Sequence, residues 1–257
     1  MASGIELVVQ GDDFGMCHAV NTGVAEAFTN GILSQASTMV ACPWFDEAAA
    51  LAAEHDIPLG VHLTLTCEWD YLRWPPLTGG PSLAGPDRTF HRTVDEARRT
   101  ADHDEAVAEL SAQVDRLLAT GRMPEYFDVH MGLVAPAAYA AVCARYDVPF
   151  TYPGLDASLT WTTISSLSQR PNATKTEWLL GYLDQIEPGV HLLVCHVATP
   201  GEELRSITGP ESEPWLWAEE YRKGDLAAVT DPRVRDVVDS RSILLTSVGR
   251  AFAGAKT

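Results

Sequence analysis

The sequence predicts a single-domain α/β protein, spanning residues 1–257, folded as a distorted (β/α) barrel with an active site at the strand ends. Short apolar runs alternate with helical patterns along the chain, which is typical of parallel α/β folds. The predicted strands are apolar on both faces, as strands covered by helices on both sides are. No glycine-rich dinucleotide motif follows the first strand, so an irregular TIM-barrel-like fold is favoured over an open sheet.

The first half of the chain contains three predicted strands, each followed by a helix or a long loop. Gly31 suits the end of the first helix, because glycine is common just after a helix C-terminus. The second helix is rich in alanine. In order, these elements are the strand Ile5–Gln10, a helix at about Ala19–Asn30, the strand Gln35–Ala41, the helix Phe45–His55 and the strand Leu59–Leu65.

The second half continues the alternation, and no Ser- or Gly-rich linker divides the chain into two domains. Thr93–Thr120 carries one long helix or two short ones, and Pro136 suits the first turn of a later helix. The remaining predicted elements are the strand Tyr126–His130, the helix Pro136–Tyr146, the short strand Val148–Tyr152, the helix Thr174–Ile186, the strand Val190–Val197 and a terminal helix near Pro232–Asp239.

Charge and composition limit the classes of partner. The formal net charge of −17 argues against nucleic acid, whose phosphates would be repelled. The apolar stretches are far too short for a membrane span, and the N-terminus lacks a basic segment followed by an apolar one. We therefore expect a soluble, cytoplasmic protein, and a homo-oligomer remains compatible with the sequence. The odd number of cysteines and the absence of a C-x-x-C pair suggest neither a disulfide framework nor a zinc-thiolate site.

The most informative motif is Gly11-Asp12-Asp13-Phe14-Gly15, which follows the first predicted strand. The carboxyl end of a parallel sheet is where loops converge on active sites, so two carboxylates there point to chemistry. A single aspartate at such a position is commonly a turn residue or a helix N-cap. One cap needs only one oxygen, so capping does not explain both aspartates.

Three later strands each deliver a histidine to a comparable position: His62, His130 and His196. Each of the first two could instead be a hydrogen-bonded core histidine. Taken together, an aspartate and two histidines from different strands form an open three-ligand site suited to a divalent metal. A second carboxylate and a third histidine nearby complete the groups needed for metal-assisted hydrolysis.

The order of four motifs resembles the YdjC/ChbG-type carbohydrate deacetylases, which are related to the HpnK proteins. The first two motifs match closely, and together the four are spread over most of the chain. They are Gly11-Asp12-Asp13-Phe14-Gly15, Gly60-Val61-His62-Leu63-Thr64-Leu65, Asp128-Val129-His130 and Cys195-His196.

This resemblance implies a distorted barrel that removes the acetyl group from an N-acetylated amino sugar. It also implies that Asp13, His62 and His130 hold one divalent metal ion. Asp12 would be the general base, and His196 the general acid for the departing amine. An alternative for His196 is that it only orients substrate or packs beneath the following loop. Zinc suits two imidazoles and one carboxylate best, with magnesium, nickel and manganese as alternatives.

Two long segments are expected to shape the substrate pocket, because loops of this length in a compact domain are commonly functional. They are Thr66–Arg92 and Ala198–Pro214, which follow the strands of His62 and His196. Aromatic rings there could stack on sugar rings or pack the loops onto the barrel. The candidate substrate-binding residues are Trp69, Tyr71, Arg73, Trp74 and Trp215.

Three functions remain open at this point. The leading one is a metal-dependent N-deacetylase acting on a small molecule or oligosaccharide that contains an amino sugar. The second is a metal-dependent hydrolase of another amide or ester on the same scaffold, since sites rather than folds determine chemistry. The third is a non-catalytic carbohydrate-binding relative. Retention of both Asp12 and Asp13 argues against the third, because binding a sugar needs no base beside the metal.

Overall fold

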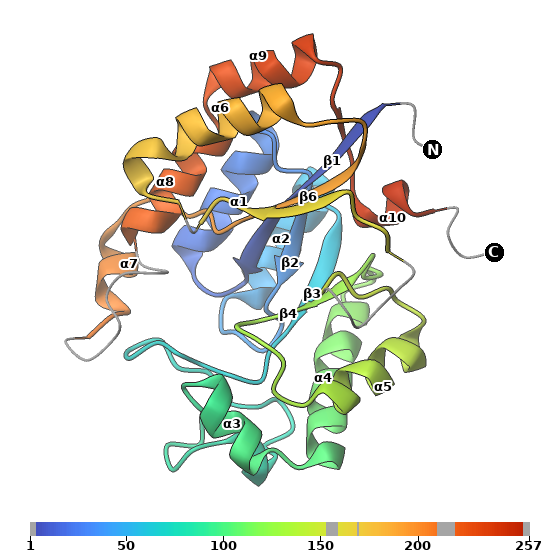
Figure 1. Cartoon of the computed structure of the whole chain (residues 1–257). Helices are drawn as coiled ribbons and strands as arrows, with labels where there is room; N and C mark the ends of the chain where they lie inside the picture. The colour runs from blue at the N-terminus through green and yellow to red at the C-terminus, as the bar shows by residue number, and fades with distance from the viewer. Residues whose placement is uncertain (1–3, 153–158, 169, 210–218, 254–257) are drawn as a thin grey trace.

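A parallel β-sheet forms the centre of the protein and is curled into a half-barrel surrounded by helices (Figure 1). The computed structural model describes residues 4–152, 159–168, 170–209 and 219–253. The strand order is β4-β3-β2-β1-β6-β5, and β7 pairs with β1. All pairings are parallel, so the carboxyl ends of the strands share one edge, as predicted. The strands are β1 Ile5–Phe14, β2 Gln35–Thr38, β3 Leu59–Leu63, β4 Phe127–Val129, β5 Thr163–Ser166, β6 Gly189–Cys195 and β7 Leu244–Leu245.

The helices largely follow the predicted positions. The backbone N–H of Gly31 donates to Ala27 and ends the first helix, as expected. The stretch before β4 forms two helices, because Asp102 caps a new helix by accepting from two backbone N–H groups. Pro136 begins α5, also as expected. The helices are α1 His18–Asn30, α2 Phe45–His55, α3 Val94–Thr100, α4 His103–Leu118, α5 Pro136–Tyr146, α6 Lys175–Gln185, α7 Glu202–Ser206, α8 Glu219–Val229, α9 Pro232–Ser240 and α10 Val248–Ala251, with short 3-10 turns at Pro81–Leu83 and Asn172–Thr174.

The strand predicted at Val148–Tyr152 is wrong as a strand. Only Phe150 forms an isolated parallel bridge, with Phe127 of β4. Pro149 lies beside it and lacks the N–H that a longer ladder would need. The sheet instead gains β5, which pairs with β6 at the other edge. The sequence gives no apolar signal for β5, because three of its four residues are polar and none of the four is buried.

Helix α8 is a second element that the sequence did not reveal. It begins with two glutamates and its mean hydropathy is low, so no clear apolar stripe marks it. It nevertheless buries Arg222 and Asp225 completely. Both side chains point toward the sheet and reach the residues described below, so a polar helix supports the site.

The core lies on both faces of the sheet, and its packing positions the strand that carries His62. Leu7 and Val9 of β1 are fully buried, as are Val61 and Leu63 of β3. Gly60 lies just before Val61, at a position where a larger side chain would clash. A Cβ there would lie 2.4 Å from the ring of Tyr126. This glycine of the Gly-x-His motif therefore permits close packing of β3 on the start of β4.

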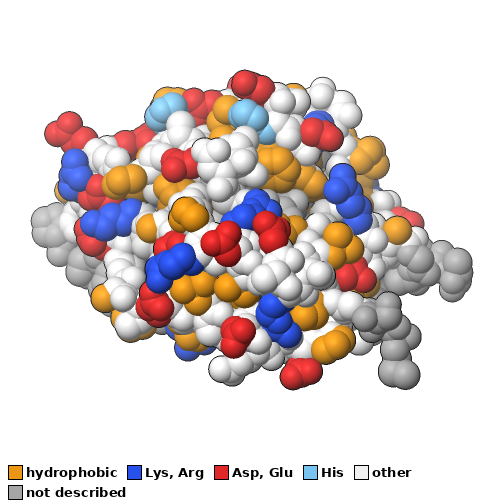
Figure 2. Space-filling view, turned by 90° about the horizontal axis from the view of Figure 1, so that it is seen from above, with side chains coloured by type: hydrophobic (Ala, Val, Ile, Leu, Met, Phe, Trp, Pro, Cys, Tyr) orange, Lys and Arg blue, Asp and Glu red, His pale blue; other side chains and the backbone are white. Residues whose placement is uncertain are grey.

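The surface carries mixed charge. Figure 2 shows acidic and basic side chains interspersed on one face, with apolar side chains in small groups between them. On that face, the described residues form no broad basic area of the kind that binds phosphate backbones. Among the described helices, none combines the length and the apolar character that crossing a bilayer requires.

Candidate metal centre and its pocket

An irregularity at the end of β1 turns two consecutive aspartates toward one pocket. In a regular strand, neighbouring side chains point to opposite faces. Here the pairing of β1 with β2 shifts register between Gly11 and Phe14, and Asp13 has φ of +66°. Both Asp12 and Asp13 therefore line the same cavity. The sequence predicts these two aspartates just beyond the strand. In the structure they lie within β1, in its last residues, where the pairing with β2 is irregular.

Asp13 meets two histidines from neighbouring strands. Its Oδ1 lies 3.5 Å from His62 Nε2 and 3.4 Å from His130 Nδ1. This oxygen is buried and has no hydrogen-bond partner. In a tetrahedral zinc site with bonds of ~2.0–2.1 Å, adjacent ligand atoms lie about 3.3 Å apart. The three residues therefore fit a divalent metal ion, and they form a group that could hold one.

The other nitrogen of each histidine is anchored by a carboxylate. His62 Nδ1 lies 2.8 Å from Asp128 Oδ1, and His130 Nε2 lies 2.9 Å from Glu68 Oε2. Ser37 also donates to Asp128 Oδ1. Such partners fix the orientation of metal-binding imidazoles. Asp12, His62 and Asp128 form another group with the spacing of metal ligands. In this group the hydrogen bond between His62 Nδ1 and Asp128 already explains why the two side chains lie close together.

Asp13 is held from its other side by α8. Arg222 Nη2 donates to Asp13 Oδ2 at 2.6 Å, and both side chains are buried. Burial raises the pKa of Asp13, but Arg222 and the two imidazoles outweigh it and hold that pKa well below its ordinary value. Asp13 is therefore ionised, with one oxygen on Arg222 and the other facing the histidines.

Asp12 lies in a different environment from Asp13. Its Oδ1 accepts a hydrogen bond of 2.7 Å from Gln10, which also donates to Asp128 Oδ2 at 2.6 Å. Gln35 in turn donates to Gln10 at 2.8 Å. Burial and the charges of Asp128 and Asp13 raise the pKa of Asp12 to about 7. A carboxylate with a pKa near neutral pH is suited to accept and return a proton.

His196 lies close to Asp12 and lines the same pocket. Its Nε2 is 3.7 Å from Asp12 Oδ2, and its Nδ1 is 2.8 Å from Ser168 Oγ. Burial, together with the positive charge of Arg222, lowers the pKa of His196 to about 3, although the charge of Asp13 opposes them. The ring is therefore neutral at physiological pH.

The pKa values of His62 and His130 are raised, in contrast to that of His196. Burial lowers the pKa of His130, but the charge of Glu68 and the contacts with Asp13 outweigh it and raise the pKa to about 9. The pKa of His62 is raised well above its ordinary value, because Asp128 and Asp12 likewise outweigh burial. The carboxylates thus favour positive charge at this point, either as protons on the imidazoles or as a cation between them.

The cavity has a volume of about 630 Å³ and opens at the carboxyl ends of the strands. Its lining combines the carboxylates, imidazoles and hydroxyls with the apolar side chains of Met131 and Ile164. It is lined by Asp12, Asp13, His62, Glu68, Val129, His130, Met131, Ile164, Ser165, Ser166, Val194 and His196. The site residues predicted from β1, β3, β4 and β6 thus lie together.

Four of the five predicted substrate-binding residues lie in the loop after β3 and do not line this cavity. Trp69 and Trp74 are buried, and Trp74 Nε1 donates to Thr66 O at 3.1 Å. Arg73 donates to the backbone of Phe90 at 2.8 Å. None of these three lines the described cavity, nor does Tyr71, which is 68% exposed. Trp215 lies outside the described residues, so its role stays a prediction.

The two long loops contact one another beside the cavity. The backbone N–H of Tyr71 donates to Ile207 O at 3.2 Å. The N–H of Gly209 donates to Asp70 Oδ2 at 2.6 Å. Segments that follow β3 and β6 are therefore joined, as expected if both border one pocket.

Comparison with known proteins identifies the family of the chain. The family model for YdjC-like proteins matches residues 6–240. The chain belongs to the YdjC-like family. A carbohydrate deacetylase from Brevibacillus brevis is 34% identical over 156 residues, which are 59% of this chain and 60% of that protein. A chitooligosaccharide deacetylase from Yersinia pestis is 28% identical over 250 residues, 85% of this chain and 96% of that protein.

Solved structures show the same fold. A proposed cellobiose-phosphate cleavage protein from Enterococcus faecalis has a TM-score of 0.80 at 23% identity, covering 96% of this chain and 99% of its own. A family 4 carbohydrate esterase from Streptomyces lividans, solved with acetate, has a TM-score of 0.51 at 12% identity, covering 95% and 93%. The half-barrel of a YdjC-like protein is thus shared with more distant carbohydrate-active proteins.

Proposed function

We propose that this YdjC-like protein is a metal-dependent hydrolase that removes the N-acetyl group from a small molecule or oligosaccharide containing an amino sugar. One observation carries the proposal. The buried Asp13 Oδ1 has no hydrogen-bond partner and faces His62 Nε2 and His130 Nδ1 at metal-site spacing. The names of the Brevibacillus and Yersinia relatives support the substrate class.

Asp13, His62 and His130 would hold one divalent ion, with zinc as the first choice. Two imidazoles and one carboxylate suit zinc and leave a position open for water or substrate. Magnesium, nickel and manganese are the alternatives, since the preferred ligands of these ions overlap. Arg222 occupies the second oxygen of Asp13, so this carboxylate would offer one oxygen to the ion.

In the proposed reaction, an ion held by these ligands would lower the pKa of a water molecule and would stabilise the developing oxyanion. Asp12 accepts a proton from the attacking water, while Gln10 holds its carboxylate in place. His196, whose Nε2 lies 3.7 Å from Asp12 Oδ2, gives a proton to the departing amine. The two groups are close enough to act on one scissile amide bond.

Two other functions compete with this proposal. A hydrolase of another amide or an ester would use the same groups and differ only in the pocket around them. A non-catalytic sugar-binding protein would not need Asp12, whose pKa of about 7 suits proton transfer rather than binding. A cytoplasmic location and a homo-oligomer stay predictions from the sequence.

The decisive experiment measures acetate release from a panel of N-acetylated amino sugars and chitooligosaccharides, together with an acetylated aryl ester. Protein treated with chelator is compared with protein given one equivalent of zinc. We expect metal-dependent acetate release from an amino sugar, lost in His62→Ala and retained in His18→Ala, whose imidazole is exposed. Ester cleavage alone would favour the second function, and sugar binding without acetate release would favour the third.

A further inference from the structure

Three buried side chains from different elements lead away from His196. Ser168 Oγ lies 2.8 Å from His196 Nδ1 and donates to Asp225 Oδ2 at 2.5 Å. The other oxygen of Asp225 lies 2.6 Å from Lys175 Nζ. The side chains of Lys175 and Asp225 are completely buried. Ser168 follows β5, Lys175 begins α6 and Asp225 lies on α8, so the chain of contacts joins three elements behind the histidine.

The direction of these hydrogen bonds determines which nitrogen of His196 carries the proton. A serine hydroxyl has one hydrogen, and an ionised carboxylate can only accept. The hydrogen of Ser168 is therefore used at Asp225, and Ser168 must accept from His196 Nδ1–H. We propose that Lys175, Asp225 and Ser168 are positioning residues that hold neutral His196 as the Nδ1–H tautomer, with Nε2 presented as an acceptor toward Asp12.

The two hydrogen bonds that link His196, Ser168 and Asp225 could run in the opposite direction only if Asp225 were protonated. Burial raises the pKa of Asp225, which favours reversal. The ammonium of Lys175 opposes it, and so does the backbone N–H of His196, which donates to Asp225 Oδ2 at 2.8 Å. Lys175 is itself anchored by a hydrogen bond of 2.9 Å to Tyr221 O. A fixed cation and a fixed N–H donor thus both stabilise the ionised carboxylate.

The consequence for chemistry rests on the proposed function. A neutral ring with its lone pair at Nε2 must receive a proton there before it can give one to the amine. Asp12 Oδ2, 3.7 Å away, is the group that takes a proton from water in that proposal. One proton then leaves water, reaches Nε2 through Asp12 and ends on the amine nitrogen, as the C–O bond forms and the C–N bond breaks.

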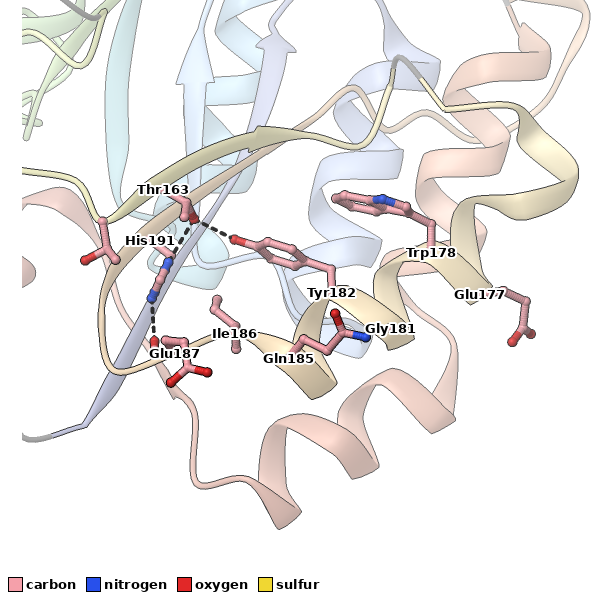
Figure 3. A pocket seen from close by; sticks show the side chains of 10 residues that line it. Thr163, Glu177, Trp178, Gly181, Tyr182, Gln185, Ile186, Glu187 and His191 are labelled. Carbon is pink, nitrogen blue, oxygen red and sulfur yellow. Dashed lines mark hydrogen bonds between the residues drawn. The ribbon is translucent and has the colours of Figure 1, made fainter.

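A second histidine, within β6, offers a comparison for His196, which directly follows that strand. His191 of β6 also has a hydroxyl 2.8 Å from its Nδ1, that of Thr163 (Figure 3). Its Nε2, however, lies 2.8 Å from the carbonyl oxygen of Glu187, which can only accept. Neutral His191 must therefore be the Nε2–H tautomer. His191 is 1% exposed and lines a second cavity beside α6.

Nitrogen-15 NMR of the zinc-loaded protein tests this directly, because protonated and unprotonated ring nitrogens resonate far apart. The signals are assigned with His196→Gln and His191→Gln. We expect protonated Nδ1 in His196 and protonated Nε2 in His191. A single Nε2–H form of His196 in the unmodified protein would overturn the proposal. This readout needs no turnover, so it is separate from the success or failure of the deacetylase assay.

Variants test the role of the hydroxyl. Ser168→Ala should give a mixture of His196 tautomers, whereas Thr163→Val, the matched control beside His191, should leave His196 unchanged. On an active substrate, Ser168→Ala should lower kcat by about ten- to a thousandfold with little change in KM, within the ~10²–10⁴-fold worth of an acid–base group. Ser168→Thr should restore both signals. An unchanged single Nδ1–H form in Ser168→Ala would contradict the proposal.

Discussion

Arg222 and Asp13 form a buried ion pair that joins α8 to the end of β1. Arg222 Nη2 donates to Asp13 Oδ2 at 2.6 Å, across 209 positions of sequence. The guanidinium also lies 5.7 Å from the ring of Trp69, in the loop after β3. A single side chain therefore connects a proposed metal ligand to the loop that borders the pocket.

Replacing Arg222 by methionine should weaken metal binding. The carboxylate of Asp13 would lose the donor that holds it, and losing such a partner typically lowers metal affinity about 10–100-fold. Breaking a buried pair should also cost about 3–5 kcal/mol of folding free energy without added metal. Competition with a chromophoric chelator and denaturant unfolding measure the two effects.

The control for this variant is Arg233→Gln, which removes an exposed arginine paired with Glu177 and Asp231. Its effect on metal affinity should be undetectable, and its effect on stability small. Equal zinc affinity in Arg222→Met and the unmodified protein would show that Arg222 does not orient Asp13.

Metal affinity should rise with pH. Without a bound cation, the pKa of His130 is about 9 and that of His62 is well above its ordinary value. Near neutral pH both rings carry protons that a cation must displace, so affinity should fall as pH falls, by about tenfold per pH unit for each proton. Calorimetry in buffers of different ionisation enthalpy counts the protons released.

Glu68→Gln is the matched variant for the pH measurement. The charge of Glu68 raises the pKa of His130 against the effect of burial, so removing it lowers that pKa. Fewer protons should then be released at neutral pH. A proton count that is unchanged by this variant, or affinity that is independent of pH, would contradict the proposed ligands.

Much of the candidate site could be predicted because its central residues lie in short motifs at strand ends. Because parallel strands end at one edge, the aspartates of the first motif could be expected near His62 and His130. The choice of Asp13, His62 and His130 as the metal ligands came from the family resemblance. The residues that hold the site residues in place could not be predicted in this way. Arg222 and Asp225 lie on a helix without an apolar stripe, and their buried charges are matched by partners distant in sequence.

The errors in the fold have local causes. Val148–Tyr152 had the composition of a strand, but Pro149 cannot continue a ladder beside the three-residue β4. The opposite error concerns β5, which is a strand that the sequence does not predict. It is a mostly polar edge strand without a buried residue, so it gives no apolar signal. Propensity describes single residues, whereas pairing depends on neighbours that only the folded chain provides.

Two aromatic residues of the loop after β3 should differ in role: Trp74 should stabilise the fold, whereas Tyr71 is free to contact substrate. Trp74 is buried and hydrogen-bonded, so Trp74→Ala should destabilise the protein by about 3–5 kcal/mol. Tyr71 is 68% exposed, so Tyr71→Ala should change stability by only about ±0.5 kcal/mol. If Tyr71 contacts sugar, its variant should raise KM for an oligosaccharide. An unchanged KM would remove it from the substrate-binding residues.

The central claim, that Asp13 binds the metal while Asp12 acts as the base, is tested most directly by metal content and turnover of Asp12→Asn and Asp13→Asn. Asp12→Asn should keep one divalent ion per chain and lower turnover by roughly two to four orders of magnitude. Asp13→Asn should lose both metal and turnover. Equal metal loss in the two variants, or full occupancy in Asp13→Asn, would contradict the account.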